Sequence, residues 1–130
     1  MKIALDANAY SDWKWGLRWM AEISTADEVH VSTTVIGELC YGFACGNHEL
    51  QNVTDLERFL ADPAVVVNPV TDATARHYAA LKKFLRFQGT PLPENDIWIA
   101  ASSIEHGTLL LTRDKHFASL PQVRVMWPEG

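Results

Sequence analysis

Four acidic residues are the part of this sequence whose types and placement point to chemistry: Asp6, Glu38, Asp96 and Asp114. Clustered carboxylates do not all ionise unless a cation lies between them, because like charges raise each other's pKa. Oxygen ligands, with no nearby set of His or Cys residues, favour Mg²⁺ or Mn²⁺ over zinc. A Mg²⁺ ion held by carboxylates activates water and stabilises charge on phosphoryl oxygens. The four acids therefore predict hydrolysis of a phosphodiester, provided that the fold brings them together.

The elements that must position these acids alternate between strand and helix. Apolar and β-branched runs predict strands at 2–5, 29–31, 64–67, 108–112 and 123–127. The run at 64–67 is continuous, as expected of a strand that is buried on both faces. Helical spacing and capping residues predict helices at 9–23, from 35 to near 46, around 56–60, from 71 or 72 through 85, and at 96–106, with a short turn or helix at 114–120.

This alternation implies crossover connections between parallel strands. We expect an α/β fold, a three-layer sandwich with a mostly parallel central sheet flanked by helices. In such a sheet, ligands bind at the carboxyl ends of the strands. Asp6 directly follows the first strand, and Asp114 lies two residues beyond the strand at 108–112. Asp96 begins a helix and Glu38 lies in the early turns of another, so the topology sends all four acids to one edge.

Each acid also has a purely structural explanation. Asp6 can end a strand, Asp96 can stabilise a helix N-terminus, and Asp114 can cap the turn that follows it. Glu38 is harder to explain in this way, because apolar residues flank it and place it at a partly buried position. Four carboxylates converging by accident is less probable than any one of them doing so, which favours a shared functional site.

Length and charge limit the classes of protein that fit. With 130 residues, the chain is long enough for a single domain spanning 1–130, and its 48% apolar composition excludes a disordered or fibrous protein. We find no apolar run of membrane-spanning length and no signal-peptide pattern, so we expect a cytoplasmic protein with no membrane partner. Sixteen acids against eleven Lys and Arg give a net charge of −5, which argues against a general, charge-driven nucleic-acid binder.

Four stretches of the sequence are similar to a known family: 5–8, 35–42, 91–101 and 110–117. They read LDAN, VIGELCYG, PLPENDIWIAA and LLTRDKHF, and the last two are the most specific. On these residues the chain resembles the PIN-domain ribonucleases, and most closely the VapC-type toxins of bacterial toxin–antitoxin pairs. The similarity runs through the whole chain, with one mild departure at Ala7, where Thr is more usual in the family.

The resemblance implies specific roles for residues of this sequence. Asp6, Glu38, Asp96 and Asp114 would be catalytic residues that bind the metal, and Thr112 and Asn8 would be polar neighbours of that site. The implied protein is a Mg²⁺-dependent endoribonuclease, with Mn²⁺ as a possible replacement, that hydrolyses RNA. The implied partners are a small cognate antitoxin, a second copy of the chain in a homodimer, and operator DNA reached only through the antitoxin.

Two further groups of residues are candidates for binding surfaces. Trp15 and Trp19 share one face of the helix expected at 9–23, and such large aromatics either fill the core or face a partner. Four basic residues of the longest helix form a solvated face or guide RNA phosphates: Arg76, Lys82, Lys83 and Arg86. Three histidines show no ligand spacing and are interpreted as structural or surface residues: His77, His106 and His116.

Two other functions remain open from the residues alone. The first is a phosphohydrolase that uses Asp6 as a covalent nucleophile. That chemistry usually needs a second Asp two residues later as general acid, and here Asn8 occupies the position. The second is a non-enzymatic role, in which the chain is a component of an antitoxin complex that regulates its operator.

Overall fold

The central feature of the computed structural model, which describes residues 1–129, is a five-stranded sheet. Its strand order is β3-β2-β1-β4-β5, and every neighbouring pair is parallel. The strands are β1 (Lys2–Leu5), β2 (Glu28–Ser32), β3 (Val65–Asn68), β4 (Leu109–Leu111) and β5 (Val125–Met126). The expected α/β fold with a parallel central sheet is confirmed.

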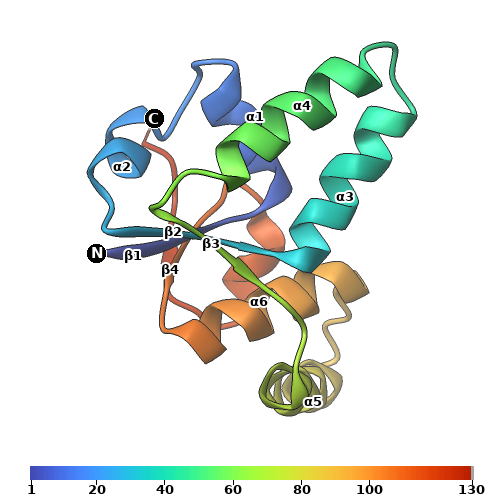
Figure 1. Ribbon diagram of the computed structural model, residues 1–130. Helices are drawn as coiled ribbons and strands as arrows, with labels where there is room; N and C mark the ends of the chain where they lie inside the picture. The colour runs from blue at the N-terminus through green and yellow to red at the C-terminus, as the bar shows by residue number, and fades with distance from the viewer. Residues whose placement is uncertain (130) are drawn as a thin grey trace.

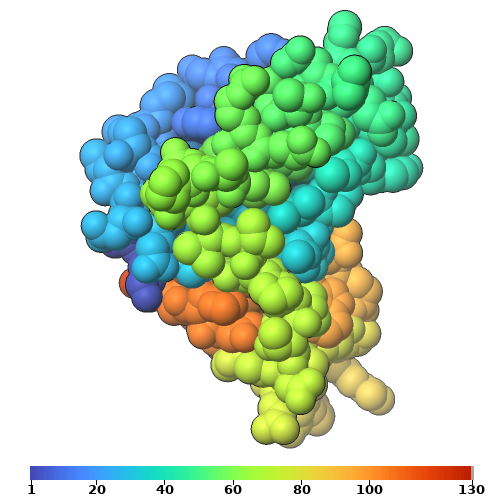
Figure 2. Space-filling model, in the orientation of Figure 1, coloured from blue at the N-terminus to red at the C-terminus, as the bar shows by residue number. Residues whose placement is uncertain are grey.

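Helices cover the two faces of this sheet. They are α1 (Ala7–Lys14), α2 (Met20–Thr25), α3 (Thr33–Ala44), α4 (Glu49–Leu60), α5 (Asp72–Gln88) and α6 (Glu94–His106), with a 3₁₀ turn, η1 (Lys115–Ser119). Figure 1 shows α5 and α6 on one side of the sheet, with α1, α3 and α4 on the other. Figure 2 shows α3 and α4 together as one continuous surface across the upper part of the molecule. None of the helices in the described chain is long and apolar enough to cross a membrane.

The prediction of a single helix at 9–23 is wrong, because two helices separated by a sharp break occupy this region. α1 ends at Lys14, and Gly16 follows in the left-handed conformation with a φ of 71°. The Gly16 N–H donates to the Trp13 carbonyl at 3.0 Å, and the Leu17 N–H donates to the Asp12 carbonyl at 2.8 Å. This pair of bonds terminates a helix when glycine takes the left-handed position. The aromatic-rich sequence around Gly16 did not indicate that the helix ends there.

The break separates the two tryptophans that were expected on one helix face. Trp15 lies at the end of α1 with 72% of its surface exposed, whereas Trp19 is only 5% exposed and packs in the hydrophobic core. Trp19 precedes α2 with a φ of 70°, and its side chain belongs to the hydrophobic core. The expectation that Trp19 faces a partner is therefore wrong for this structure, while Trp15 remains available at the surface.

Strand β3 also differs from its expected environment. The run at 64–67 predicted a strand that is buried on both faces, but β3 spans Val65–Asn68 at the edge of the sheet. Its valines are partly exposed, and Val67 is 40% exposed. A continuous apolar run predicts that a strand is present, but it does not show whether the strand lies at the centre or at the edge of the sheet. At the edge, the side chains of β3 are less completely covered.

Candidate active site

Asp6 lies buried at the carboxyl end of β1, where it caps the first turn of α1. Its Oδ1 accepts a hydrogen bond from the Ala9 N–H at 2.8 Å, which is the usual geometry of an N-capping aspartate. Its Oδ2 accepts a hydrogen bond from the Thr112 hydroxyl. Both oxygens therefore have partners within the chain, and the carboxylate is held in one orientation.

Thr112 links the carboxyl ends of the neighbouring strands β1 and β4. It follows β4, is fully buried, and donates to Asp6 while its Oγ1 accepts from the Asp114 N–H at 2.9 Å. Asp114 in turn caps η1, because its Oδ1 accepts from the His116 N–H at 2.9 Å. The family resemblance implied that Thr112 is a polar neighbour of the site. In the structure its hydroxyl connects Asp6 to the loop that carries Asp114.

Asp96 and Asp114 meet around the imidazole of His116. Asp96 lies in the first turn of α6, and its Oδ2 is 2.9 Å from His116 Nδ1. The same nitrogen is 3.2 Å from Asp114 Oδ1. One ligand atom from each of the three residues lies within 4.8 Å of the other two. The interpretation of His116 as a structural or surface residue is therefore incomplete, because it lies in the acidic site.

Glu38 reaches the same site from α3, where it is half-buried. The Asn95 side chain lies close enough to its carboxylate to lower the pKa of Glu38, and Asp96 and Asp114 lie close enough for their charges to raise it. Asn8 lies in the first turn of α1 with an exposed side chain. The structure thus gathers all four acids at one edge of the sheet, and sequence reasoning missed His116 and Asn95. Both lie within two residues of a predicted acid, which is the signal that could have found them.

Comparisons with known proteins show the family of this chain. The family model of the PIN domain matches residues 4–123. The chain belongs to the PIN-domain family. Among its relatives, Ribonuclease VapC4 of Mycobacterium tuberculosis is 26% identical over 121 residues, which cover 93% of this chain and 82% of that protein. Ribonuclease VapC2 of Haemophilus influenzae is 29% identical over 89 residues, which cover 68% of this chain and 66% of that protein.

Solved structures with the same fold as this PIN domain are toxin–antitoxin complexes. VapBC2 from Rickettsia felis bound to a DNA fragment from their promoter has a TM-score of 0.86 at 21% identity, covering 99% of this chain and 100% of that chain. DNA-bound VapBC from Salmonella typhimurium has a TM-score of 0.84 at 22% identity, with 97% of each chain covered. These likenesses show the fold, and with the family match they confirm the resemblance to the VapC-type PIN-domain ribonucleases.

The electrostatics of this PIN domain favour a cation at the acidic site. Burial raises the pKa of Asp6 to about 6, although the hydrogen bonds from Thr112 and the Ala9 N–H oppose part of that rise. The nearby charges of Asp114 and Asp96 also contribute to this raised pKa. Burial is also the largest cause of the raised pKa values of Glu38 and Asp96. A divalent cation among these oxygens would offset both the burial and the repulsion.

The stability of this PIN domain without divalent cations is expected to fall as the pH rises from about 4 to above 6. The pKa of Asp6 is about 6 in the folded chain against an ordinary value of 3.8. The stability that its protonated form contributes is present below the lower value and is lost as the pH rises through the higher one, by at most about 3 kcal/mol. Urea unfolding in EDTA across this range measures the loss.

A matched variant and added metal make this measurement specific. Asp6→Asn carries no titrating group at this position, so its free energy of unfolding should depend less on pH. Added Mg²⁺ should restore stability to the wild type at about pH 7, since an ion that binds only the folded state adds about 2.7 kcal/mol at a hundred times its Kd. A wild-type profile in EDTA that is as flat as that of Asp6→Asn would contradict the assignment.

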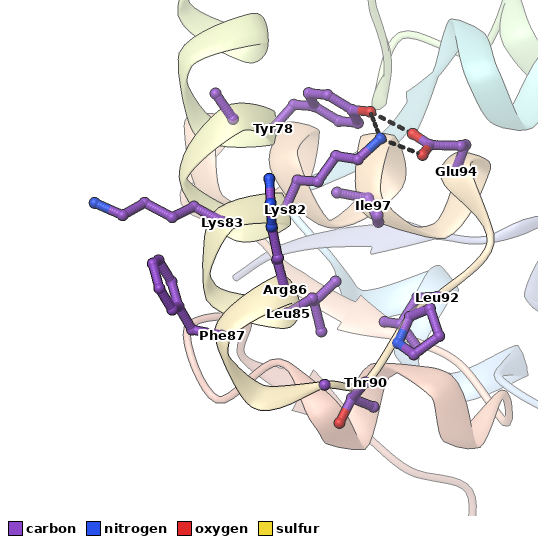
Figure 3. Close-up of a pocket in the computed structure, with 13 residues that line it drawn as sticks. Tyr78, Lys82, Lys83, Leu85, Arg86, Phe87, Thr90, Leu92, Glu94 and Ile97 are labelled. Atoms are coloured by element: carbon purple, nitrogen blue, oxygen red, sulfur yellow. Dashed lines mark hydrogen bonds and ion pairs between the residues drawn. The ribbon is translucent and has the colours of Figure 1, made fainter.

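The four basic residues predicted to guide RNA all lie on α5. Lys82, Lys83 and Arg86 line a groove of about 840 Å³ between α5 and the segment that leads into α6, whereas Arg76 is exposed elsewhere on the helix. Figure 3 shows Lys82 pointing toward Glu94 and Lys83 pointing away. Lys82 Nζ lies 2.6 Å from Glu94 Oε1, so its charge is already paired within the chain.

Proposed function

We propose that this PIN domain is a metal-dependent endoribonuclease and the toxin of a toxin–antitoxin pair. The observation that carries the proposal is the convergence of Asp6, Glu38, Asp96 and Asp114 at the carboxyl edge of the parallel sheet. The relatives named ribonucleases support RNA as the substrate. The acids, rather than any basic surface, are the feature that suits hydrolysis of a phosphodiester in a chain with a net charge of −5.

The residues present fit a divalent ion such as Mg²⁺ or Mn²⁺. Asp96 and Asp114 offer carboxylate oxygens that lie close together. The first turn of α6 holds Asp96, and the start of η1 holds Asp114. Thr112 orients Asp6 and the Asp114 loop together, while Asn95 lies near the Glu38 carboxylate. A divalent ion at this position would supply an activated water and stabilise charge on the phosphoryl oxygens. Lys83 and Arg86 remain predicted contacts for RNA phosphates.

The test is cleavage of RNA by the purified chain, freed from any partner. Total RNA incubated with the protein and Mg²⁺ or Mn²⁺ should show new ends at defined positions, and EDTA should abolish them. Mapping the ends also identifies which class of RNA is cut. Equal cleavage in EDTA and in Mg²⁺ would refute metal dependence, and intact RNA under all conditions would refute the nuclease.

An antitoxin partner is the second part of the proposal. The solved structures of the same fold contain toxin and antitoxin together, some of them with DNA. In this chain the segment after α1 and the first residue of α2 expose three large apolar side chains, which suits a protein partner: Trp15, Leu17 and Met20. Operator DNA would be reached through that partner, and a homodimer stays a prediction.

Growth of a host that expresses the chain tests this part. Expression alone should stop growth, and co-expression of the small reading frame beside its gene should restore it and yield a complex in a pull-down. A chain that is harmless when expressed alone would refute the toxin, even if RNA cleavage stands.

Neither alternative function gains support from the site. The two oxygens of Asp6 are both engaged, by the Ala9 N–H and by Thr112, and the residue is 5% exposed. A covalent nucleophile needs an accessible oxygen in line with its substrate. A purely non-enzymatic role leaves unexplained why four buried or half-buried carboxylates converge, at a cost in repulsion and desolvation.

A further inference from the structure

His116 differs from the four acids in offering a nitrogen to the site. Its Nδ1 lies 2.9 Å from Asp96 Oδ2 and 3.2 Å from Asp114 Oδ1. Among residues 1–129, these three side chains form the one group of three or more Asp, Glu, His or Cys residues whose ligand atoms all lie within 4.8 Å of one another. The site therefore contains two oxygens and one nitrogen at its most compact point, and not oxygens alone.

The spacing of these atoms matches that of ligands around a six-coordinate ion. In an octahedral site with bonds of about 2.1 Å, neighbouring ligand atoms are about 3.0 Å apart. The two distances from Nδ1 agree with such neighbouring positions. The same distances fit hydrogen bonds from a protonated Nδ1 to the two carboxylates, so an entering ion would take the place of that proton.

The backbone around His116 holds the imidazole at the site. Asp114 caps η1 by accepting the His116 N–H at 2.9 Å, so the start of the turn is fixed. The next residue, Phe117, is 1% exposed and anchors the turn in the hydrophobic core. On the far side, Asp96 belongs to α6, whose residues Ile97 to Ser103 are mostly buried against the sheet. The three ligand positions are thus set by packed elements and not by a free loop.

We infer that His116 Nδ1 is a direct ligand of the metal ion at this site, beside Asp96 and Asp114, and that the site therefore prefers Mn²⁺ to Mg²⁺. The inference rests on the proposed metal-dependent function and adds one ligand and an ion preference to it. Mg²⁺ takes oxygen ligands and dehydrates reluctantly, whereas transition-metal ions accept imidazole nitrogen more readily. A site with Nδ1 in place of one oxygen ligand therefore binds Mn²⁺ more tightly relative to Mg²⁺ than a site with oxygen ligands alone.

Pulsed electron paramagnetic resonance of the wild-type chain with one equivalent of Mn²⁺ tests the ligand directly. A coordinated imidazole produces nitrogen-14 modulation of the Mn²⁺ signal, and we expect this modulation in the wild type. Bound Mn²⁺ without nitrogen-14 modulation would overturn the inference. The measurement requires no substitution and does not depend on catalysis.

Calorimetric titration of two variants tests the ion preference. His116→Gln should weaken Mn²⁺ binding by at least about tenfold, since losing even an outer partner of a ligand costs that much, and should weaken Mg²⁺ binding less. His48→Gln, which changes an exposed histidine at the start of α4, should bind both ions like the wild type. Equal losses for the two ions in His116→Gln would overturn the preference.

The outcomes also separate this inference from the proposed function. If Mn²⁺ binds, RNA is cleaved and no nitrogen coupling is seen, the assignment of His116 fails and the nuclease stands. If neither ion binds the wild type and RNA stays intact, the nuclease fails and the His116 assignment fails with it. Circular dichroism of His116→Gln should match the wild type, because the side chain is half-exposed.

Discussion

An Asp96→Asn protein is expected to cleave RNA about a thousandfold more slowly than the wild type, because a metal ion stabilises phosphoryl charge by several kcal/mol. Asn has nearly the same shape as Asp but no negative charge, so the site loses a metal ligand while the packing of α6 is kept. Asp96 is 9% exposed, and its Oδ2 lies 2.9 Å from His116 Nδ1. Initial rates of cleavage of a mapped RNA site in Mg²⁺ give the measurement.

The matched control is Asp72→Asn, which makes the same chemical change at an exposed acid in the first turn of α5. Its cleavage rate should stay within a small factor of the wild-type rate. Circular dichroism and urea unfolding should show both variants folded. An Asp96→Asn protein that is folded and cleaves at the wild-type rate would refute the metal site.

Trp19→Ala is expected to lower the free energy of unfolding by about 3–5 kcal/mol, the usual cost of removing a large aromatic side chain from a core. Trp19 is 5% exposed and belongs to the main hydrophobic cluster. Trp15→Ala is the matched comparison, because Trp15 is 72% exposed and its loss should change stability by no more than about 0.5 kcal/mol. Urea unfolding of both variants measures the difference.

A third variant separates volume from polarity at this position. Within residues 1–129, the buried Nε1 of Trp19 has no hydrogen-bond partner. Trp19→Phe keeps most of the apolar volume and removes that donor, so it should be less destabilising than Trp19→Ala. Similar losses for Trp15→Ala and Trp19→Ala would mean that the break at Gly16 does not place the two side chains in different environments.

The sequence by itself determined the order of elements and the edge at which the acids lie. Alternation of apolar strands with capped helices predicts a parallel sheet, because parallel strands need crossover connections. Parallel strands in turn align their carboxyl ends, so Asp6 after β1 and Asp114 after β4 reach the same edge without any knowledge of side-chain positions. The short motifs around Glu38 and Asp96 also indicated the family, and the match of the PIN-domain model to residues 4–123 confirms it.

The tertiary structure decided which side chains touch within that frame. The hydrogen bond between Asp6 and Thr112 joins residues 106 positions apart, and strand register alone places them together. His116 meets Asp96 because η1 folds back against α6, a contact that local spacing does not encode. Trp15 and Trp19 lie on different elements for a local reason, because Gly16 takes a positive φ and ends α1. Which of the two tryptophans is buried depends on the packing around them. Sequence periodicity describes one element at a time, whereas burial and ligand geometry arise between elements.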